Sequence, residues 1–194
     1  MKKQIVKFFI TVNFIFFSGG WSSAINAAEF GGVLNMGFDF GGDTLGGFVL
    51  TDGSTTKVNA GDGLQISGGV KITNDQNNLE AETTIGWKYS GINNVANASA
   101  DWTRFPLEIL GFYKLKQWRF GGGLVYQLSP TFKEDLNGDK VEANFDNTLG
   151  YLVQADFLLG SRGFIAGRFT TIDYSYNGAS INGDSIGVYI GAHF

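Results

Sequence analysis

The chain has 194 residues, 43% of them hydrophobic, with 29 glycines, two prolines and no cysteine. This composition excludes a disulfide-stapled scaffold and thiol chemistry, and glycine spread through alternating segments excludes a collagen-like chain. The formal net charge is −4, and because the chain has no basic patch we expect no nucleic-acid partner.

The first 27 residues predict a secretory signal peptide. Three lysines within the first seven residues precede an apolar stretch at 8–17, and small residues follow. This pattern is typical of a cleaved leader and is too short for a stable anchor. We expect cleavage after Ala27, with Ala24 and Ala28 as alternatives. The exported part would be one domain, 28–194, with 11 basic and 18 acidic residues and a net charge of −7.

Eight segments of the remaining chain alternate between apolar and polar residues, which is the pattern of β-strands. In the first segment Leu34, Met36 and Phe38 share one parity, and Asn35 and Asp39 share the other. The segments are roughly 30–41, 62–73, 79–90, 104–114, 117–128, 147–159, 164–176 and 185–194.

The connections between these segments alternate in length. Short connections are expected at 74–78, 115–116 and 160–163, and long ones at 42–61, 91–103, 129–146 and 177–183. An antiparallel meander with all its long loops at one end gives this order. Because lipid-exposed strands must satisfy every backbone group within the protein, the sequence predicts an all-β, eight-stranded antiparallel up-and-down transmembrane β-barrel. Its last strand should pair with residues 34–40 to remove the sheet edges.

The charged residues at the polar positions of the strands distinguish this prediction from a soluble up-and-down barrel, which would place apolar residues inside. Six aromatic residues on the apolar parity suit interfacial girdles: Trp87, Tyr89, Tyr113, Trp118, Tyr126 and Tyr151. The opposite parity carries five acids and six bases, and we expect these charges to pair as an ion network that fills a narrow lumen. They are Asp39, Lys71, Glu80, Glu82, Lys88, Arg104, Glu108, Lys114, Arg119, Asp156 and Arg168.

The leader, the eight segments, the loop pattern and the final SIGVYIGAHF resemble the small bacterial outer-membrane β-barrels, a broad class that includes the OmpA transmembrane domain, OmpX and OmpW. The resemblance covers 28–194 and singles out no family. It implies a Gram-negative outer membrane, surrounding lipid and periplasmic termini. It also implies that the final strand is the signal read by the barrel-assembly machinery, by strand addition to an open edge. The residues that match this signal are Ile186, Val188, Ile190 and Phe194.

The sequence contains only weak matches to catalytic or metal-binding motifs. Some barrels of this class modify lipid A with a histidine, a serine and an acid near the outer face. The single histidine, His193, is expected at the periplasmic end as a hydrogen-bonded residue of the barrel floor, so we expect no enzyme. Asp135, Asn137, Asp139 and Asp146 partly match a calcium loop, but Lys140 replaces its glycine. The Asn137-Gly138 pair instead predicts a tight hairpin turn.

The functional expectation is therefore a structural or surface-interaction protein with a closed polar lumen and no cofactor or metal. A narrow channel for small or hydrophobic molecules is the first alternative, and a lipid A-modifying enzyme is the second. In the first long loop, Leu45, Phe48, Val49 and Leu50 are expected to pack on the barrel rim, with partner binding or a lumen cap as alternatives. The extracellular partner, if any, has no signature in the sequence.

Overall fold

The computed structural model describes residues 28–49, 55–74, 78–95 and 98–194, and the expected signal peptide lies outside these ranges. No helix in the described ranges is long and apolar enough to cross a membrane. The strands are β1 (Ala28–Phe40), β2 (Thr44–Val49), β3 (Thr55–Asn59), β4 (Gly63–Asn74), β5 (Leu79–Val95), β6 (Ala98–Leu115), β7 (Trp118–Leu136), β8 (Asp139–Asn144), β9 (Thr148–Leu159), β10 (Gly163–Thr171), β11 (Asp173–Tyr176), β12 (Ala179–Asn182) and β13 (Ser185–His193).

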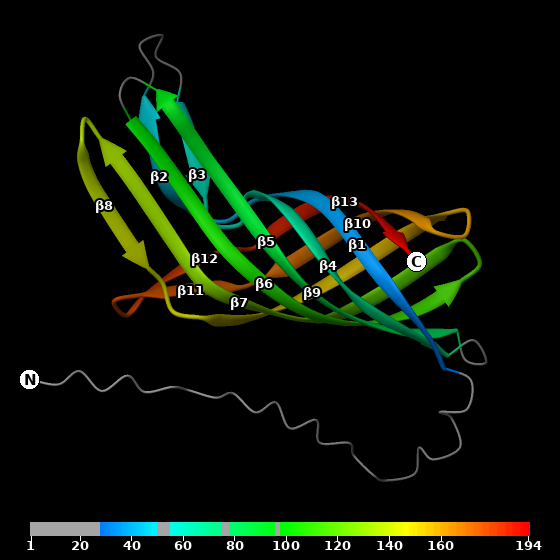
Figure 1. Cartoon of the computed structure of the whole chain (residues 1–194). Helices are drawn as coiled ribbons and strands as arrows, with labels where there is room; N and C mark the ends of the chain where they lie inside the picture. Colours follow the sequence, from blue (N-terminus) through cyan, green and yellow to red (C-terminus); the bar gives the residue numbers. More distant parts are fainter. Residues whose placement is uncertain (1–27, 50–54, 75–77, 96–97) are drawn as a thin grey trace, which may run out of the picture.

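Eight of these strands close into one antiparallel barrel (Figure 1). Their order around the sheet is β6, β5, β4, β1, β13, β10, β9, β7, and β7 pairs with β6 to complete the ring. The first and last strands pair from Val33 with His193 to Phe40 with Ile186. Phe194 continues this ladder, since its amide donates to the Gly32 carbonyl at 3.0 Å. The predicted fold and the predicted first-to-last closure are both confirmed.

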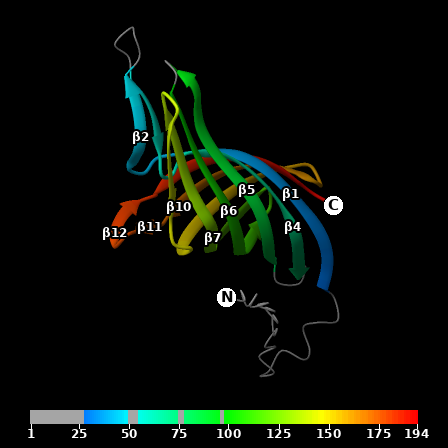
Figure 2. The same cartoon turned by 60° about the vertical axis from the view of Figure 1, so that its left-hand side comes forward.

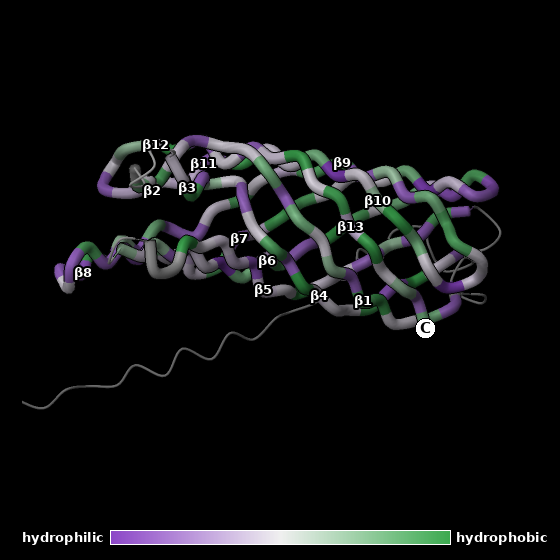
Figure 3. The backbone as a smooth tube through the Cα atoms, turned by 90° about the horizontal axis from the view of Figure 1, so that it is seen from above, coloured by the Kyte–Doolittle hydropathy of each residue, from purple (hydrophilic) through white to green (hydrophobic). Residues whose placement is uncertain are grey.

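Apolar side chains cover the outside of the barrel. Along β13, Ile186, Val188 and Ile190 are exposed, whereas Gly187 and Tyr189 between them are buried. Figure 3 shows the same alternation of apolar and polar residues along the other barrel strands. An apolar surface of this extent is unfavourable in water and suits hydrocarbon. The barrel strands are therefore built to face lipid.

Two predicted long loops are in fact strand, which corrects the expected loop boundaries. Barrel strands β5, β6 and β7 extend far past the barrel, and β8 joins β7 across a tight turn, so a four-stranded sheet projects from one end (Figures 1 and 2). The chemical class of the buried face changes along β6. Within the barrel the charged Arg104 is buried and the apolar Phe105 is exposed, whereas in the projecting part the buried residue is the apolar Trp102. Beyond the lipid the apolar parity faces inward, as in a soluble sheet, so a membrane-barrel pattern does not detect it.

The other two long connections also contain hairpins, β2–β3 and β11–β12. The first of these covers an apolar core above the polar lumen. Leu45 packs against this core and Phe48 belongs to it, which turns these residues inward rather than onto the rim. The side chain of Val49 and all of Leu50 lie outside the described residues. Above the lumen this core comprises Phe48, Val58, Ala60, Ala98, Ala100, Trp102, Phe132, Phe145, Ile172 and Tyr174. Leu110, Phe112, Val125 and Leu152 continue the same cluster down into the barrel.

Candidate functional site

The lower lumen is organised around the guanidinium of Arg119, on β7. Its Nε donates to Asp156 Oδ2 at 2.7 Å, and its Nη2 lies 2.5 Å from the same oxygen. Nη1 donates to Glu80 Oε2 at 2.7 Å and also to Glu82. Three carboxylates from two strands, β5 and β9, therefore share one buried cation. Such a group persists in a low-dielectric interior only while its charges remain paired.

Aromatic rings hold this guanidinium in place. Arg119 Cζ lies 4.0 Å from the ring centroid of Phe112, on the intervening strand β6, so the side chain reaches over that ring to β5. Gly121 has no side chain and leaves the space that the Phe112 ring occupies. His193 stacks on Phe164, and its Nε2 lies 3.2 Å from Glu82 Oε1. The histidine is thus a buried floor residue at the end of the barrel opposite the projecting sheet.

A second ion pair spans the middle of the lumen. Arg168 Nη1, from β10, donates to Glu108 Oε1, from β6, at 2.8 Å. Glu108 also accepts hydrogen bonds from Gln65 at 2.9 Å and from Thr84 at 3.3 Å. Gln154 joins the middle and lower groups, because it accepts from Arg168 Nε at 2.8 Å and donates to Asp156 at 2.8 Å.

The upper lumen contains one further ion pair. Lys88 Nζ lies 2.7 Å from Asp39 Oδ2, and the Tyr189 hydroxyl donates to the same oxygen at 2.5 Å. Arg104 forms no ion pair with a carboxylate of the described ranges. It donates instead to the backbone carbonyls of Ala60 and Asp62.

Arg104 therefore fastens a piece of main chain inside the barrel mouth. Trp102 Nε1 also donates to the Ala60 carbonyl, at 2.9 Å, and Ala60 is completely buried. Gly61 is required at this crossing, because a Cβ there would lie 2.7–2.9 Å from three backbone carbonyl oxygens. The segment 58–63 thus lies between the polar lumen and the apolar core above it.

The eleven charged residues do not all enter the network. Nine of them are buried, and their contacts are those given above. Lys114 lies at the other mouth of the barrel, opposite the projecting sheet, with its Nζ 3.8 Å from Glu80 Oε1 and 40% of its side chain exposed. Lys71 is half-buried at the same mouth and forms no ion pair among the described residues.

Uncharged residues that the sequence analysis did not select complete the lumen. Ser67 donates to Asn35, and Gln154 links Arg168 to Asp156. Tyr189 donates to Asp39 and to Gln65, which in turn donates to Glu108. All of them lie at the inward-facing positions of their strands, so the alternation of the sequence is the signal that identifies them as lumen residues. Residue charge was too narrow a criterion for selecting lumen residues.

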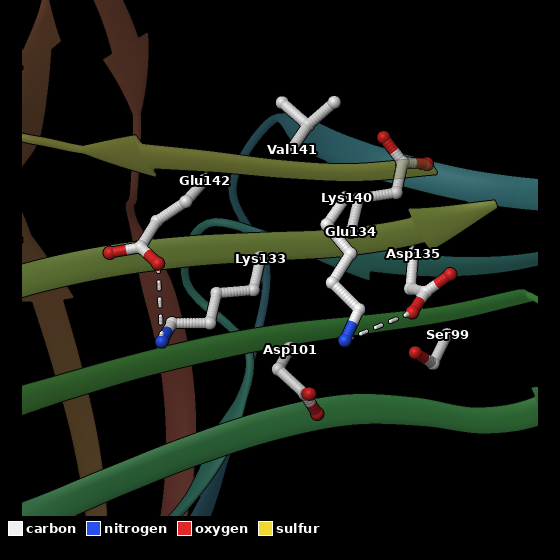
Figure 4. Close-up of a pocket in the computed structure, with 8 residues that line it drawn as sticks. All are labelled: Ser99, Asp101, Lys133, Glu134, Asp135, Lys140, Val141 and Glu142. Atoms are coloured by element: carbon white, nitrogen blue, oxygen red, sulfur yellow. Dashed lines mark ion pairs between the residues drawn. The ribbon is translucent and has the colours of Figure 1, made fainter. Parts of the chain in front are cut away.

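The projecting sheet carries charge on its outer face (Figure 4). Lys133 Nζ lies 3.3 Å from Glu142 Oε2 on β8, and Lys140 Nζ lies 3.9 Å from Asp135 on β7. Asp101 on β6 is directly paired with Lys133, which extends the first row across three strands. These side chains line an open pocket of about 550 Å³.

The partial calcium motif forms a turn in this sheet. Asn137 and Gly138 have positive φ angles of 55° and 97°, as the predicted tight turn requires. Asp135 Oδ1 accepts the Gly138 amide at 2.9 Å. Within the part of the chain that the structure describes, no group of three or more acidic, histidine or cysteine side chains is placed to hold a metal.

Hydrogen bonds also hold the loop before the last strand. Asp184 Oδ1 accepts the Ile172 amide at 3.0 Å. Burial pushes the pKa of Asp184 upward, but hydrogen bonds from the Ile172 amide, Thr171 and Asn182 outweigh this effect and keep the pKa below the usual value for aspartate. The carboxylate therefore stays ionised and adds to the negative charge of this end of the barrel.

The residues expected to form the assembly signal all face outward. Ile186, Val188, Ile190 and Phe194 are exposed on the lipid side, and Phe194 pairs with Gly32 at the end of the barrel opposite the projecting sheet. This places an apolar row along the strand that closes the ring.

The comparisons with known proteins agree with the architecture. No family model and no curated protein sequence matches the chain. Among solved structures, the attachment invasion locus protein Ail of Yersinia pestis superposes with a TM-score of 0.57 at 10% identity, over 85% of this chain and 97% of Ail. Ail in complex with the heparin analogue sucrose octasulfate gives 0.56 at 10% identity, over 86% and 99%. Neisserial surface protein A gives 0.53 at 10% identity, over 86% and 97%. The chain has the fold of the small eight-stranded outer-membrane β-barrels.

Proposed function

We propose that this protein is a non-enzymatic outer-membrane barrel that uses its lumen for stability and its projecting sheet to bind a surface partner. The projecting sheet carries the proposal, because β8 pairs only with β7 among the described strands and leaves one edge open. An open edge is a ready template for strand addition. The filled lumen supports the structural half of the proposal, since the cations and acids that cross it hold one another.

Charge indicates the kind of partner. The described residues at the projecting end include three exposed lysines, Lys57, Lys133 and Lys140. Five acids there are equally exposed, namely Asp43, Asp139, Glu142, Asp146 and Asp173, and five more are half-buried, namely Asp62, Asp101, Glu134, Asp135 and Asp184. This balance disfavours a polyanion such as the heparin analogue bound by Ail and favours a basic partner. Leu136 and Val141 expose apolar surface on the inner face of the same sheet. A partner strand that alternates apolar and basic residues would match both faces.

A synthetic peptide of alternating valine and lysine tests this proposal. Cells displaying the protein should bind the fluorescent peptide, and a variant in which Asn-Gly replaces residues 134–141 should lose at least tenfold in binding, about 1.4 kcal/mol. The replacement keeps Lys133 opposite Glu142 across a two-residue turn, so the barrel is undisturbed.

The matched control is Glu142→Gln, which retains the edge and removes one charge. It should weaken binding only about twofold to fivefold, as expected for a single exposed charge. Equal binding by the displayed protein and the shortened variant would refute the role of the projecting sheet.

We also propose that the outward row of β13, ending at Phe194, is read by the barrel-assembly machinery in the outer membrane. Deleting Phe194 should lower the yield of heat-modifiable, membrane-inserted protein severalfold, because the row loses its terminal aromatic ring. Leu136→Gln on the projecting sheet is the control and should leave the yield unchanged. Leu45 is unsuitable as a control because it packs on the apolar core. Equal yields for both variants would contradict this assignment.

A further inference from the structure

The end of the barrel opposite the projecting sheet has a basic mouth that neither the lumen network nor the projecting sheet uses. Lys71, Lys114, Lys116 and Arg162 line one pocket of about 350 Å³, together with the buried floor residue His193. Lys116 lies in the turn between β6 and β7, and Arg162 in the turn between β9 and β10. Four strands and turns thus bring their cations to one opening.

Most of this positive charge has no ion-pair partner in the part of the chain that the structure describes. Lys71, Lys116 and Arg162 form no ion pair with any described residue. Among the described residues, Glu80 is the one acid that lines the pocket, and it is held by Arg119 at 2.7 Å while Lys114 is 3.8 Å away. The cations of the lumen differ, because their charges meet carboxylates or backbone carbonyls.

The position of the pocket indicates where its ligand would come from. The outward side chains next to the turn at 115–118 include Tyr113 and Trp118, both half-exposed, and Trp118 packs edge-on against Phe157 at 5.1 Å. Aromatic residues of this kind mark the level of lipid headgroups. Lys116 and Arg162, in exposed turns at the same end, are placed to reach a phosphate at that level.

We propose that this basic mouth, formed by Lys71, Lys114, Lys116 and Arg162, binds a phosphate group. Lysine supplies compact positive charge, and the arginine fork matches phosphate geometry. The phosphate belongs either to an anionic lipid of the adjoining leaflet or to a free phosphate ion, and the two sources share this chemistry.

The test uses the refolded protein in nanodiscs of neutral phosphatidylcholine, to which either phosphatidylglycerol or inorganic phosphate is added. Native mass spectrometry counts retained phosphatidylglycerol, and calorimetry follows inorganic phosphate. Lys116→Asn with Arg162→Gln should weaken binding about 30-fold, because each cation near a phosphate contributes roughly fivefold to the affinity. Asparagine is chosen because position 116 has φ of 54°, which asparagine tolerates.

The control removes the same charge from the other end of the barrel, with Lys57→Gln and Lys140→Gln, and should leave binding unchanged. Loss of retained phosphatidylglycerol in the mouth variant alone supports a lipid ligand, and loss of phosphate binding alone supports a free ion. No binding of either probe, or equal weakening in both variants, overturns the proposal. These outcomes do not depend on the projecting sheet, so they are independent of the proposed function.

Discussion

Replacing Arg119 with methionine should lower the free energy of unfolding by about 3–5 kcal/mol, the usual cost of leaving buried charges without their partner. Methionine fills much of the same space, so the loss comes from charge and hydrogen bonding rather than from a cavity. Asp156, Glu80 and Glu82 would then face one another in a closed interior. Urea titration of the refolded barrel, followed by gel mobility and tryptophan fluorescence, measures this change.

A rescue variant and a surface control make the Arg119 result specific. Glu80→Gln, Glu82→Gln and Asp156→Asn added to Arg119→Met should recover a large part of the lost stability, because neutral amides no longer repel. Lys133→Met removes a pair whose side chains are 59% and 51% exposed and should change the unfolding free energy by at most about 1 kcal/mol. If Arg119→Met were no worse than Lys133→Met, the lumen charges would not hold the barrel.

Replacing Trp102 with alanine should cost about 3–5 kcal/mol in the region above the lipid. Trp102 is completely buried, meets Phe145 and Tyr174 edge-on at 5.1 and 5.2 Å, and donates to the Ala60 carbonyl. Its loss opens the apolar core and frees segment 58–63. Hydrogen exchange should therefore accelerate in β3 and at 58–63 while the amides of β13 remain protected.

Trp118→Ala is the matched control for the Trp102 variant. Trp118 faces outward at the opposite end of the barrel and is 47% exposed. Its removal should leave exchange in β3 and at 58–63 unchanged. Equal acceleration in both tryptophan variants would show that segment 58–63 is not held by the core around Trp102.

Much of the barrel follows from parity alone. The alternation at 185–194 correctly predicts that Ile186, Val188 and Ile190 face outward and that β13 pairs with β1. This works because a strand between lipid and a polar lumen must place one chemical class on each face. The alternation also places Arg119 on the inward face, where it contacts three carboxylates. It does not specify which charged residues pair with one another.

Parity failed where the surroundings of the strands change. Between Ala98 and Phe105, β6 lies outside the lipid and its outer face meets water. The residues buried there are the apolar Trp102, Ala100 and Ala98, so the apolar side of the strand faces inward instead of outward. The acceptors for Arg104 could not be predicted for a different reason. They are backbone carbonyls of a connecting segment, and carbonyls carry no residue signature.

Single-channel recording of the refolded protein in planar bilayers tests most directly the claim that the barrel is a closed scaffold for its projecting sheet. The side chains that cross the lumen and segment 58–63 at its mouth predict a baseline without stable steps of porin size, at both polarities and in high salt. A reproducible channel of porin size, abolished by heat denaturation before insertion, would contradict the account.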